Sequence, residues 1–200
     1  MRVLVACEES QVVCTAFRDK GHEAYSCDLQ PCSGGHPEWH LQCDALEMLK
    51  IHWDMIVAHP PCTYLTNAGA VRLFERDHTI KDREREAEGW RAKAFFMAFY
   101  NAECDKVAIE NPVPLKYWNL PKYTQIIEPY MFGDAWRKRT CLWLRGLPPL
   151  FCTDIVVPEG LWTGSTSAKK SSYTIAGHRS PKLRSRSFAG VGRAMAQQWG

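Results

Sequence analysis

Apolar residues fall into short runs rich in β-branched side chains, separated by segments with helical spacing. Residues 2–7 (RVLVAC) are such a run, residues 10–21 place apolar positions at helical intervals, and residues 22–28 (HEAYSCD) form a second run. Ser10 is the expected N-cap of the intervening helix, and Gly21 its expected stop. The pattern predicts that the chain begins with a strand–helix–strand unit.

The same alternation continues along the chain. Residues 53–61 read as a strand that ends in a loop, 82–104 as a long helix, and 106–112 as a strand stopped by proline. Residues 140–144 predict a further strand, and 187–200 a closing helix. Strands that alternate with helices predict an α/β domain with a mostly parallel sheet and helices on both faces.

Polar and reactive residues follow the predicted strands. Ligands of such sheets collect at the carboxyl ends of the strands. We therefore expect the functional residues at this edge, where the sequence places Cys7, Glu8, Glu9, Asp28, Asp44, Pro60, Pro61, Cys62, Glu110 and Asn111.

Composition fits one globular domain. The 200 residues are 46% hydrophobic and 24% charged, with no apolar run long enough to span a membrane and no signal-peptide pattern. We expect a cytoplasmic protein with no membrane partner. Its nine cysteines, an odd number, then predict reduced thiols and not a disulfide framework.

Charge is unevenly distributed, although the net charge is only +3. No acidic residue follows Glu159, whereas seven cations do: Lys169, Lys170, Arg179, Lys182, Arg184, Arg186 and Arg193. Such a basic segment suits a nucleic-acid backbone, or is simply a solvated tail. Within it, the composition of residues 163–172 predicts a loop.

Cys62 is a candidate nucleophile. Proline fixes its own φ and restricts the preceding residue, so His59-Pro60-Pro61 is a stiff arm that ends at this thiol. A helix starting at Cys62 would lower the pKa of the thiol and favour the reactive thiolate. The alternative is a structural cysteine in a proline-bounded turn.

Glu110 is a candidate general acid. It ends a predicted strand at the same edge as Cys62, and its apolar neighbours are expected to raise the pKa of its carboxyl group. Alone it would be a helix cap or a surface acid. The pairing of a thiol with a protonatable carboxyl at one edge is the more specific feature.

Residues 60–69 (PPCTYLTNAG) and 109–114 (IENPVP) resemble the signature motifs of the DNA (cytosine-5) methyltransferases, and most closely the short bacteriophage forms. The resemblance implies a Rossmann-like, S-adenosylmethionine-dependent methyltransferase fold. It implies that Cys62 adds to carbon 6 of cytosine, that Glu110 hydrogen-bonds or protonates nitrogen 3, and that carbon 5 is methylated. If the chain is phage-encoded, it acts in the host cytoplasm.

The resemblance also implies further site residues. Asp28 would hold the ribose hydroxyls of S-adenosylmethionine, and Asp44 its adenine amino group. Arg137 and Arg139 would lie by the target base and Glu110, and the helix within 187–200 would close the cofactor pocket. The full cofactor set is Cys7, Glu8, Glu9, Ser10, Asp28, Leu29, Asp44, Ala45 and Pro60.

Two features depart from the family pattern. The first loop, within residues 5–13 (VACEESQVV), lacks the usual glycines. Glu8 or Glu9 would then meet the cofactor ammonium group, or both lie in a surface turn. In addition, only residues 148–182 stand where a large target-recognition domain is usual, between catalytic parts 1–147 and 183–200.

This very reduced recognition region leaves the substrate open. Low specificity, a partner that supplies specificity, and a single-stranded or free cytosine nucleotide substrate are alternatives to duplex DNA. A non-catalytic methyltransferase-like protein that binds nucleic acid is a further alternative.

Residues 27–43 contain zinc-ligand types: Cys27, Cys32, His36, His40 and Cys43. Their spacing matches no zinc pattern, so we predict no metal site and expect the histidines to order the loop. Trp136 and Trp162 are candidates for stacking on bases, the alternative being a place in the core.

Overall fold

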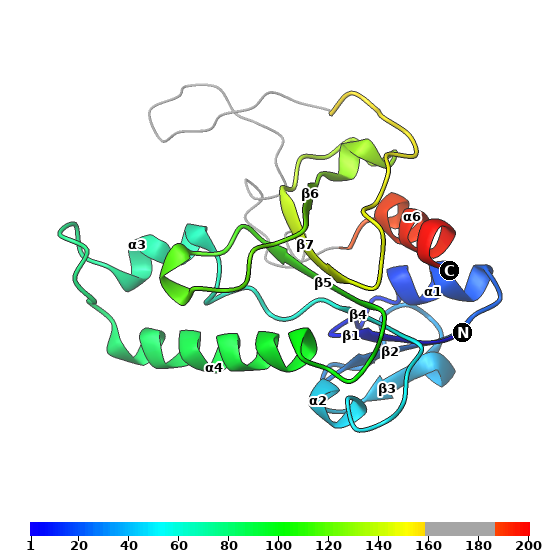
Figure 1. Cartoon of the computed structure of the whole chain (residues 1–200), viewed down its shortest axis with the longest axis horizontal. Helices are drawn as coiled ribbons and strands as arrows, with labels where there is room; N and C mark the ends of the chain where they lie inside the picture. Colours follow the sequence, from blue (N-terminus) through cyan, green and yellow to red (C-terminus); the bar gives the residue numbers. More distant parts are fainter. Residues whose placement is uncertain (159–186) are drawn as a thin grey trace.

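A computed structural model describes residues 1–158 and 187–200. Seven strands form one sheet in the order β3-β2-β1-β4-β5-β7-β6 (Figure 1). The strands are β1 (Arg2–Ala6), β2 (Glu23–Asp28), β3 (His40–Gln42), β4 (Met55–Ala58), β5 (Val107–Pro112), β6 (Gln125–Ile127) and β7 (Thr140–Arg145). Strands β1 to β5 pair in parallel, and β7 is antiparallel to both β5 and β6. The predicted mostly parallel α/β sheet is therefore confirmed.

Helices cover both faces of this sheet, as predicted. The α-helices are α1 (Val12–Asp19), α2 (Ala45–Met48), α3 (Ala70–Leu73), α4 (Arg83–Tyr100) and α6 (Ala189–Trp199). Short 3-10 helices are η1 (Pro37–Trp39), η2 (Asn67–Gly69), η3 (Lys116–Trp118) and η4 (Pro129–Met131). Helices α1 and α6 lie side by side, and α4 runs along the other face (Figure 1).

Successive residues of the central strands enter two separate cores. Val3 and Val5 pack with α1 and α6, whereas Leu4 packs with α4. Because both faces are covered, β1 and β4 are apolar at nearly every position, as buried parallel strands require. The strand ends are thus held by packing on both sides.

The start of α1 differs from the prediction. The N-cap is Gln11, in the left-handed region with φ 58°, and its side chain makes no capping bond, so Ser10 is not the cap. The predicted stop is confirmed, because Gly21 follows the C-cap with φ +82°. Carboxylate oxygens of Glu8 fill the capping role instead, as described below.

The sequence pattern missed the short elements β3, β6, α2 and α3. Of the predicted recognition region 148–182, residues 148–158 pack on the fold: Gln125 exchanges hydrogen bonds with the Leu150 backbone, and Gln198 with that of Phe151. The predictions for 159–182, for the loop 163–172, for Trp162 and for all the C-terminal cations except Arg193 lie outside the described residues.

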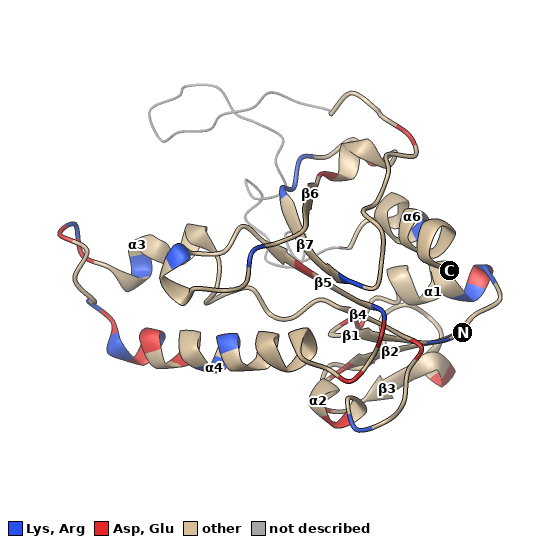
Figure 2. Ribbon diagram, in the orientation of Figure 1, with Lys and Arg blue, Asp and Glu red and all other residues tan. Residues whose placement is uncertain are grey.

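Helices α3, α4 and η3 project from one side of the molecule (Figure 1). Gly89 allows α4 to approach η3 closely, since a Cβ there would lie 2.0 Å from the Trp118 ring. Basic and acidic residues are interspersed along α4 (Figure 2), so this helix has no face of a single charge sign. None of the helices within the described ranges has the length and apolarity needed to cross a membrane.

Candidate active site

The carboxyl ends of β1, β2, β4 and β5 meet at one edge of the sheet, as predicted. Register pairs Ala6 with Cys27 and with Ala58, and Ala58 with Ile109. The residues that follow each strand therefore form one row. Two parts of this row differ in character and are described in turn.

The first part lies at the ends of β1, β2 and β3. Cys7 has a left-handed backbone, with φ 60°; burial raises the pKa of its thiol, and the charges of Asp28 and Asp44 raise it further. These three residues therefore lie near one another. Asp28 accepts a hydrogen bond from Gln30 N at 2.9 Å, and Asp44 caps α2 by accepting from Leu46 N at 2.9 Å.

The remaining predicted cofactor residues surround this group. Glu9 and Ser10 are half-buried in the turn after β1, and the Glu9 carbonyl accepts a hydrogen bond from Ser33 N. Leu29 is exposed after β2, and Ala45 is buried at the start of α2. A carboxylate at the end of each of two neighbouring strands suits hydroxyl and amino donors.

Glu8 is buried in the same turn, with 2% of its surface exposed. Its two oxygens accept hydrogen bonds from Val13 N at 2.7 Å and Cys14 N at 3.1 Å, which satisfies the first turn of α1. The alternative of a surface turn is therefore wrong for Glu8. Burial raises the pKa of this carboxyl group, although nearby His59 and the two N–H groups act to lower it.

The second part begins with the arm at residues 59–62. The Pro60 carbonyl accepts a hydrogen bond from Asn111 Nδ2 at 3.0 Å, which ties the arm to the end of β5. Cys62 is half-buried, and its carbonyl accepts from Leu65 N and Thr66 N, so a turn and not a helix follows it. The structure therefore does not place the start of a helix at this thiol.

The segments that follow Cys62 and Glu110 are bound to each other. Asn67 N donates to the Val113 carbonyl at 3.0 Å, and Leu115 N donates to the Leu65 carbonyl at 2.7 Å. Arg85 of α4 donates to the Thr63 carbonyl at 2.9 Å. Thiol and carboxylate therefore belong to segments whose relative position is fixed by backbone hydrogen bonds.

Glu110 is surrounded by polar groups. Its Oε2 lies 3.1 Å from His59 Nδ1, and both side chains are mostly buried, with 17% and 13% exposed. Burial raises the pKa of Glu110, but the charge of Lys138 and the bond to His59 outweigh it and lower the pKa to about 2. The predicted raised pKa is therefore wrong, and this carboxyl group is ionised at neutral pH.

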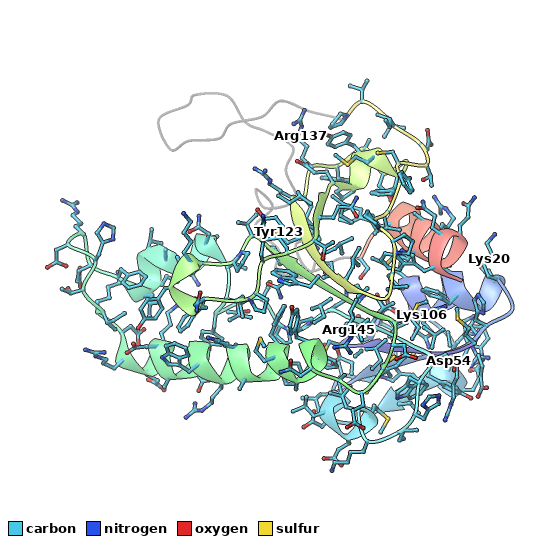
Figure 3. The ribbon with its side chains drawn as sticks, in the orientation of Figure 1. Lys20, Asp54, Lys106, Tyr123, Arg137 and Arg145 are labelled. Atoms are coloured by element: carbon cyan, nitrogen blue, oxygen red, sulfur yellow. The ribbon has the colours of Figure 1, made fainter. Side chains whose placement is uncertain are left out.

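The cation that faces Glu110 is Lys138, between the two predicted arginines. Exposed Arg137 lies over the ring of Tyr130, 5.6 Å from its centroid, at the outer end of the sheet (Figure 3). Arg137 and Arg139 are exposed and lower the pKa of Glu128, and neither lines the cavity beside Glu110. The structure therefore does not bring these arginines to Glu110.

Register explains this outcome. Glu110 lies directly opposite Leu142, so alternate residues of β7 share its face, and Thr140 and Lys138 continue that series. The odd-numbered arginines are exposed. In residues 137–140 (RKRT), side chains alternate between the two faces of the extended chain, so Lys138 and the two arginines point to opposite sides. Which of these sides faces Glu110 depends on the pairing of β7 with β5.

A small cavity of about 30 Å³, partly open to solvent, lies beside Glu110. His59, Lys138 and Thr140 give it a polar side, and its apolar wall comes from α1, β6, η4 and the region of α6: Val13, Ile127, Pro129, Phe188, Val191 and Met195. Cys62 is not among its lining residues. His59, Lys138 and Thr140 were missed as site residues; the position of His59 between a strand and two prolines was the available signal.

The Cys/His residues of 27–43 bond elsewhere. Cys27 Sγ and Cys43 Sγ are 3.7 Å apart, Cys32 Sγ donates to Gln11, and His40 pairs with Ser26. His36 stacks on Trp39. Within residues 1–158 and 187–200, no three His, Cys, Asp or Glu side chains are grouped to hold a metal ion.

Solved methyltransferases have similar structures. EhMeth, a methyltransferase of Entamoeba histolytica, matches with a TM-score of 0.51 at 11% identity, over 78% of this chain and 57% of that one. A protein assigned as a prophage-encoded DNA modification methyltransferase (E. coli) gives a TM-score of 0.46 at 12% identity, over 79% and 52%. A triple mutant of DNMT2 from Spodoptera frugiperda gives 0.42 at 13%, over 78% and 54%.

The chain thus spans just over half the length of each of these structures. No protein-family model and no curated protein matches the sequence. The similarity to EhMeth is a similarity of fold, and the strand order given above places an antiparallel β7 between β5 and β6 of this chain. The described part of the chain therefore has the α/β Rossmann-like fold of a methyltransferase.

Proposed function

We propose that this chain is a DNA (cytosine-5) methyltransferase that uses S-adenosylmethionine and forms a covalent adduct through Cys62. The observation that carries the proposal is the joining of the Cys62 arm to the end of β5. Asn111 and the backbone bonds between residues 65–67 and 113–115 hold the thiol segment and the Glu110 segment together. A nucleophile and a carboxyl group on one fixed frame suit addition to an aromatic ring.

The chemistry follows from what cytosine lacks. Its carbon 5 is a poor nucleophile until a thiolate adds to carbon 6 and a proton arrives at nitrogen 3. Cys62 Sγ would form the bond to carbon 6, while Glu110 holds the proton at nitrogen 3. Loss of the carbon 5 proton and expulsion of the Cys62 thiolate then restore the ring.

The first part of the site would hold the cofactor. When bound, S-adenosylmethionine supplies the methyl group for carbon 5. Asp28 and Asp44 would accept hydrogen bonds from the ribose hydroxyls and the adenine amino group, with Cys7, Glu9, Ser10, Leu29, Ala45 and Pro60 around them. Buried Glu8 would act by fixing the turn through α1.

DNA is the proposed substrate, and a base within a duplex would have to leave the stack to reach the cavity, at a cost of a few kcal/mol. Arg137 and Arg139, on either side of Lys138, are exposed and do not line the cavity. They would contact phosphates around the flipped base.

The test uses an oligonucleotide with 5-fluorocytosine, in duplex and single-stranded form. After methyl transfer the fluorine cannot leave as the proton does, so a covalent adduct that survives denaturing gel electrophoresis should accumulate only with S-adenosylmethionine. Cys62→Ala should abolish it, whereas Cys152→Ala, which removes an exposed thiol, should not. Persistence of the adduct in Cys62→Ala would exclude the assignment.

The same assay separates the alternatives. Methylation of dCMP without any reaction on DNA would replace the DNA substrate by a free nucleotide. Salt-dependent DNA binding with no adduct and no cofactor affinity would identify a non-catalytic binder.

A further inference from the structure

The proposed chemistry needs a proton that Glu110 alone does not carry. Its carboxyl group is ionised at neutral pH, because Lys138 and His59 lower its pKa to about 2 against the effect of burial. Nitrogen 3 of the base must nevertheless be protonated as the thiolate adds. A second group must therefore hold this proton in the resting protein.

His59 is in the position to hold it. Its backbone N–H donates to the Ala6 carbonyl at 2.9 Å, and Pro60 and Pro61 restrict the chain after it. The imidazole is thereby held with Nδ1 at 3.1 Å from Glu110 Oε2. The imidazole of His59 and the carboxylate of Glu110 both line the cavity, together with Lys138 and Thr140.

The charges around His59 come from three elements. Glu110 of β5 contacts Nδ1, buried Glu8 of the β1–α1 turn is near enough to be influenced by the imidazole, and Lys138 before β7 faces Glu110. Glu110, Glu8 and Lys138 are therefore the charged groups around the imidazole. His59 Nε2 is buried and has no hydrogen-bond partner among the described residues, which leaves it for water or a base in the cavity.

We propose that His59 is a positioning residue that carries the proton delivered through Glu110 to nitrogen 3 of the base. This inference rests on the proposed function. As the Cys62 Sγ–carbon 6 bond forms, the Nδ1–H bond breaks and an Oε2–H bond forms; that O–H rotates about its C–O bond and gives its proton to nitrogen 3. His59 is left neutral, and Glu110 is again ionised.

The reverse transfer closes the cycle. When the Cys62 thiolate leaves, the proton on nitrogen 3 returns through Glu110 to Nδ1, so His59 is not consumed. The proton from carbon 5 is the one released to solvent, and Nε2 can exchange protons with the cavity between turnovers. The mechanism therefore requires that Nδ1, the nitrogen that contacts Glu110, keeps its position.

His59→Asn tests the inference, because its amide nitrogen can replace the Nδ1 hydrogen bond but cannot transfer a proton. The rate constant of adduct formation on the 5-fluorocytosine duplex should fall by about 10²-fold or more, and the loss of rate of the wild type at alkaline pH should disappear. In His59→Ala, added imidazole should restore part of the rate. His52→Asn, which alters an exposed histidine, is the matched control.

A second readout does not need activity. The NMR chemical shift of His59 Nδ1 should change in Glu110→Gln, because Nδ1 lies 3.1 Å from Glu110 Oε2, and the shifts of the exposed His52 ring should not change. An unchanged His59 Nδ1 chemical shift, or a wild-type rate and pH profile in His59→Asn, would overturn the inference while the Cys62 adduct still supports the proposed function. Absence of any adduct in the wild type would instead contradict the proposed function.

Discussion

The turn after β1 and the end of β5 each bury a glutamate, and the pKa values of the two carboxyl groups shift in opposite directions. Burial raises the pKa of Glu8, whose oxygens accept hydrogen bonds from two backbone N–H groups of the described residues. Burial also acts to raise the pKa of Glu110, yet Lys138 and His59 lower it to about 2. Two residues of the same type therefore have different environments along one row of strand ends.

The difference distinguishes a structural glutamate from a glutamate that lines the cavity at this edge of the sheet. Glu8 accepts hydrogen bonds from the first turn of α1, so its carboxyl group is used within the fold. Glu110 faces a cavity with a cation and an imidazole at hand, which is the arrangement expected where protons move. Burial alone does not tell the two roles apart; the charged neighbours do.

The largest expected effect is on activity, when the charge of each glutamate is removed in turn. Glu110→Gln should lower the rate constant of 5-fluorocytosine adduct formation by about 10²–10⁴-fold, because the amide cannot hold and release the proton. Glu8→Gln, the matched change in the other region, should lower it by less than about tenfold. Equal losses in the two variants would remove the distinction.

A smaller effect should appear in stability as a function of pH. The depressed pKa of Glu110 contributes stability that is present above its ordinary value of 4.5 and is lost as pH falls toward about 2. Lys138→Met should raise this pKa and remove about 2 kcal/mol of that contribution, measured by urea unfolding from pH 2 to 7. Arg139→Met is the control, and a pH-dependent loss there of the same size would contradict the assignment of Lys138.

The smallest effect should be that of Glu8 on stability, and its sign should be opposite. Because the folded state raises the pKa of Glu8, it holds the proton more tightly than the unfolded chain does, and this contribution is lost as pH rises above 4.5. Glu8→Gln gives up one acceptor oxygen at α1, a cost of about 1 kcal/mol.

The free energy of unfolding of the wild type should therefore approach that of Glu8→Gln as pH rises. The same urea series measures it. A difference that widens with pH would mean that the carboxylate is stabilised in the fold, contrary to the environment described for Glu8.

Much of the fold was predictable because it depends on local patterns. Apolar runs of four to six residues and the helical spacing of 10–21, 82–104 and 187–200 identified five of the seven strands and the three longest helices. Strands β3 and β6 have only three residues each, too few for a period to be visible. The short α2 and α3 escaped for the same reason.

The candidate site was predictable in its location but not in its electrostatics. Cys62 follows β4 and Glu110 lies on β5. These two strands are neighbours in the sheet, as the alternation of strands and helices predicted. His59 and Lys138 were missed because the sequence does not show that either side chain lies beside Glu110. Their importance arises from contacts with Glu110 across 51 and 28 positions of the sequence, which no local pattern contains.

The sequence by itself determined the alternation of strands and helices, the glycine-free first turn and the stiff arm before Cys62, since these follow from side-chain shape and backbone restriction. Only the tertiary structure decided that Lys138 and not Arg137 or Arg139 faces Glu110, and that Glu8 is buried. The reason is physical: strand alternation fixes which residues share a face, but pairing with β5 fixes which face meets the carboxylate. The sign of a pKa shift then depends on charges brought together by that pairing.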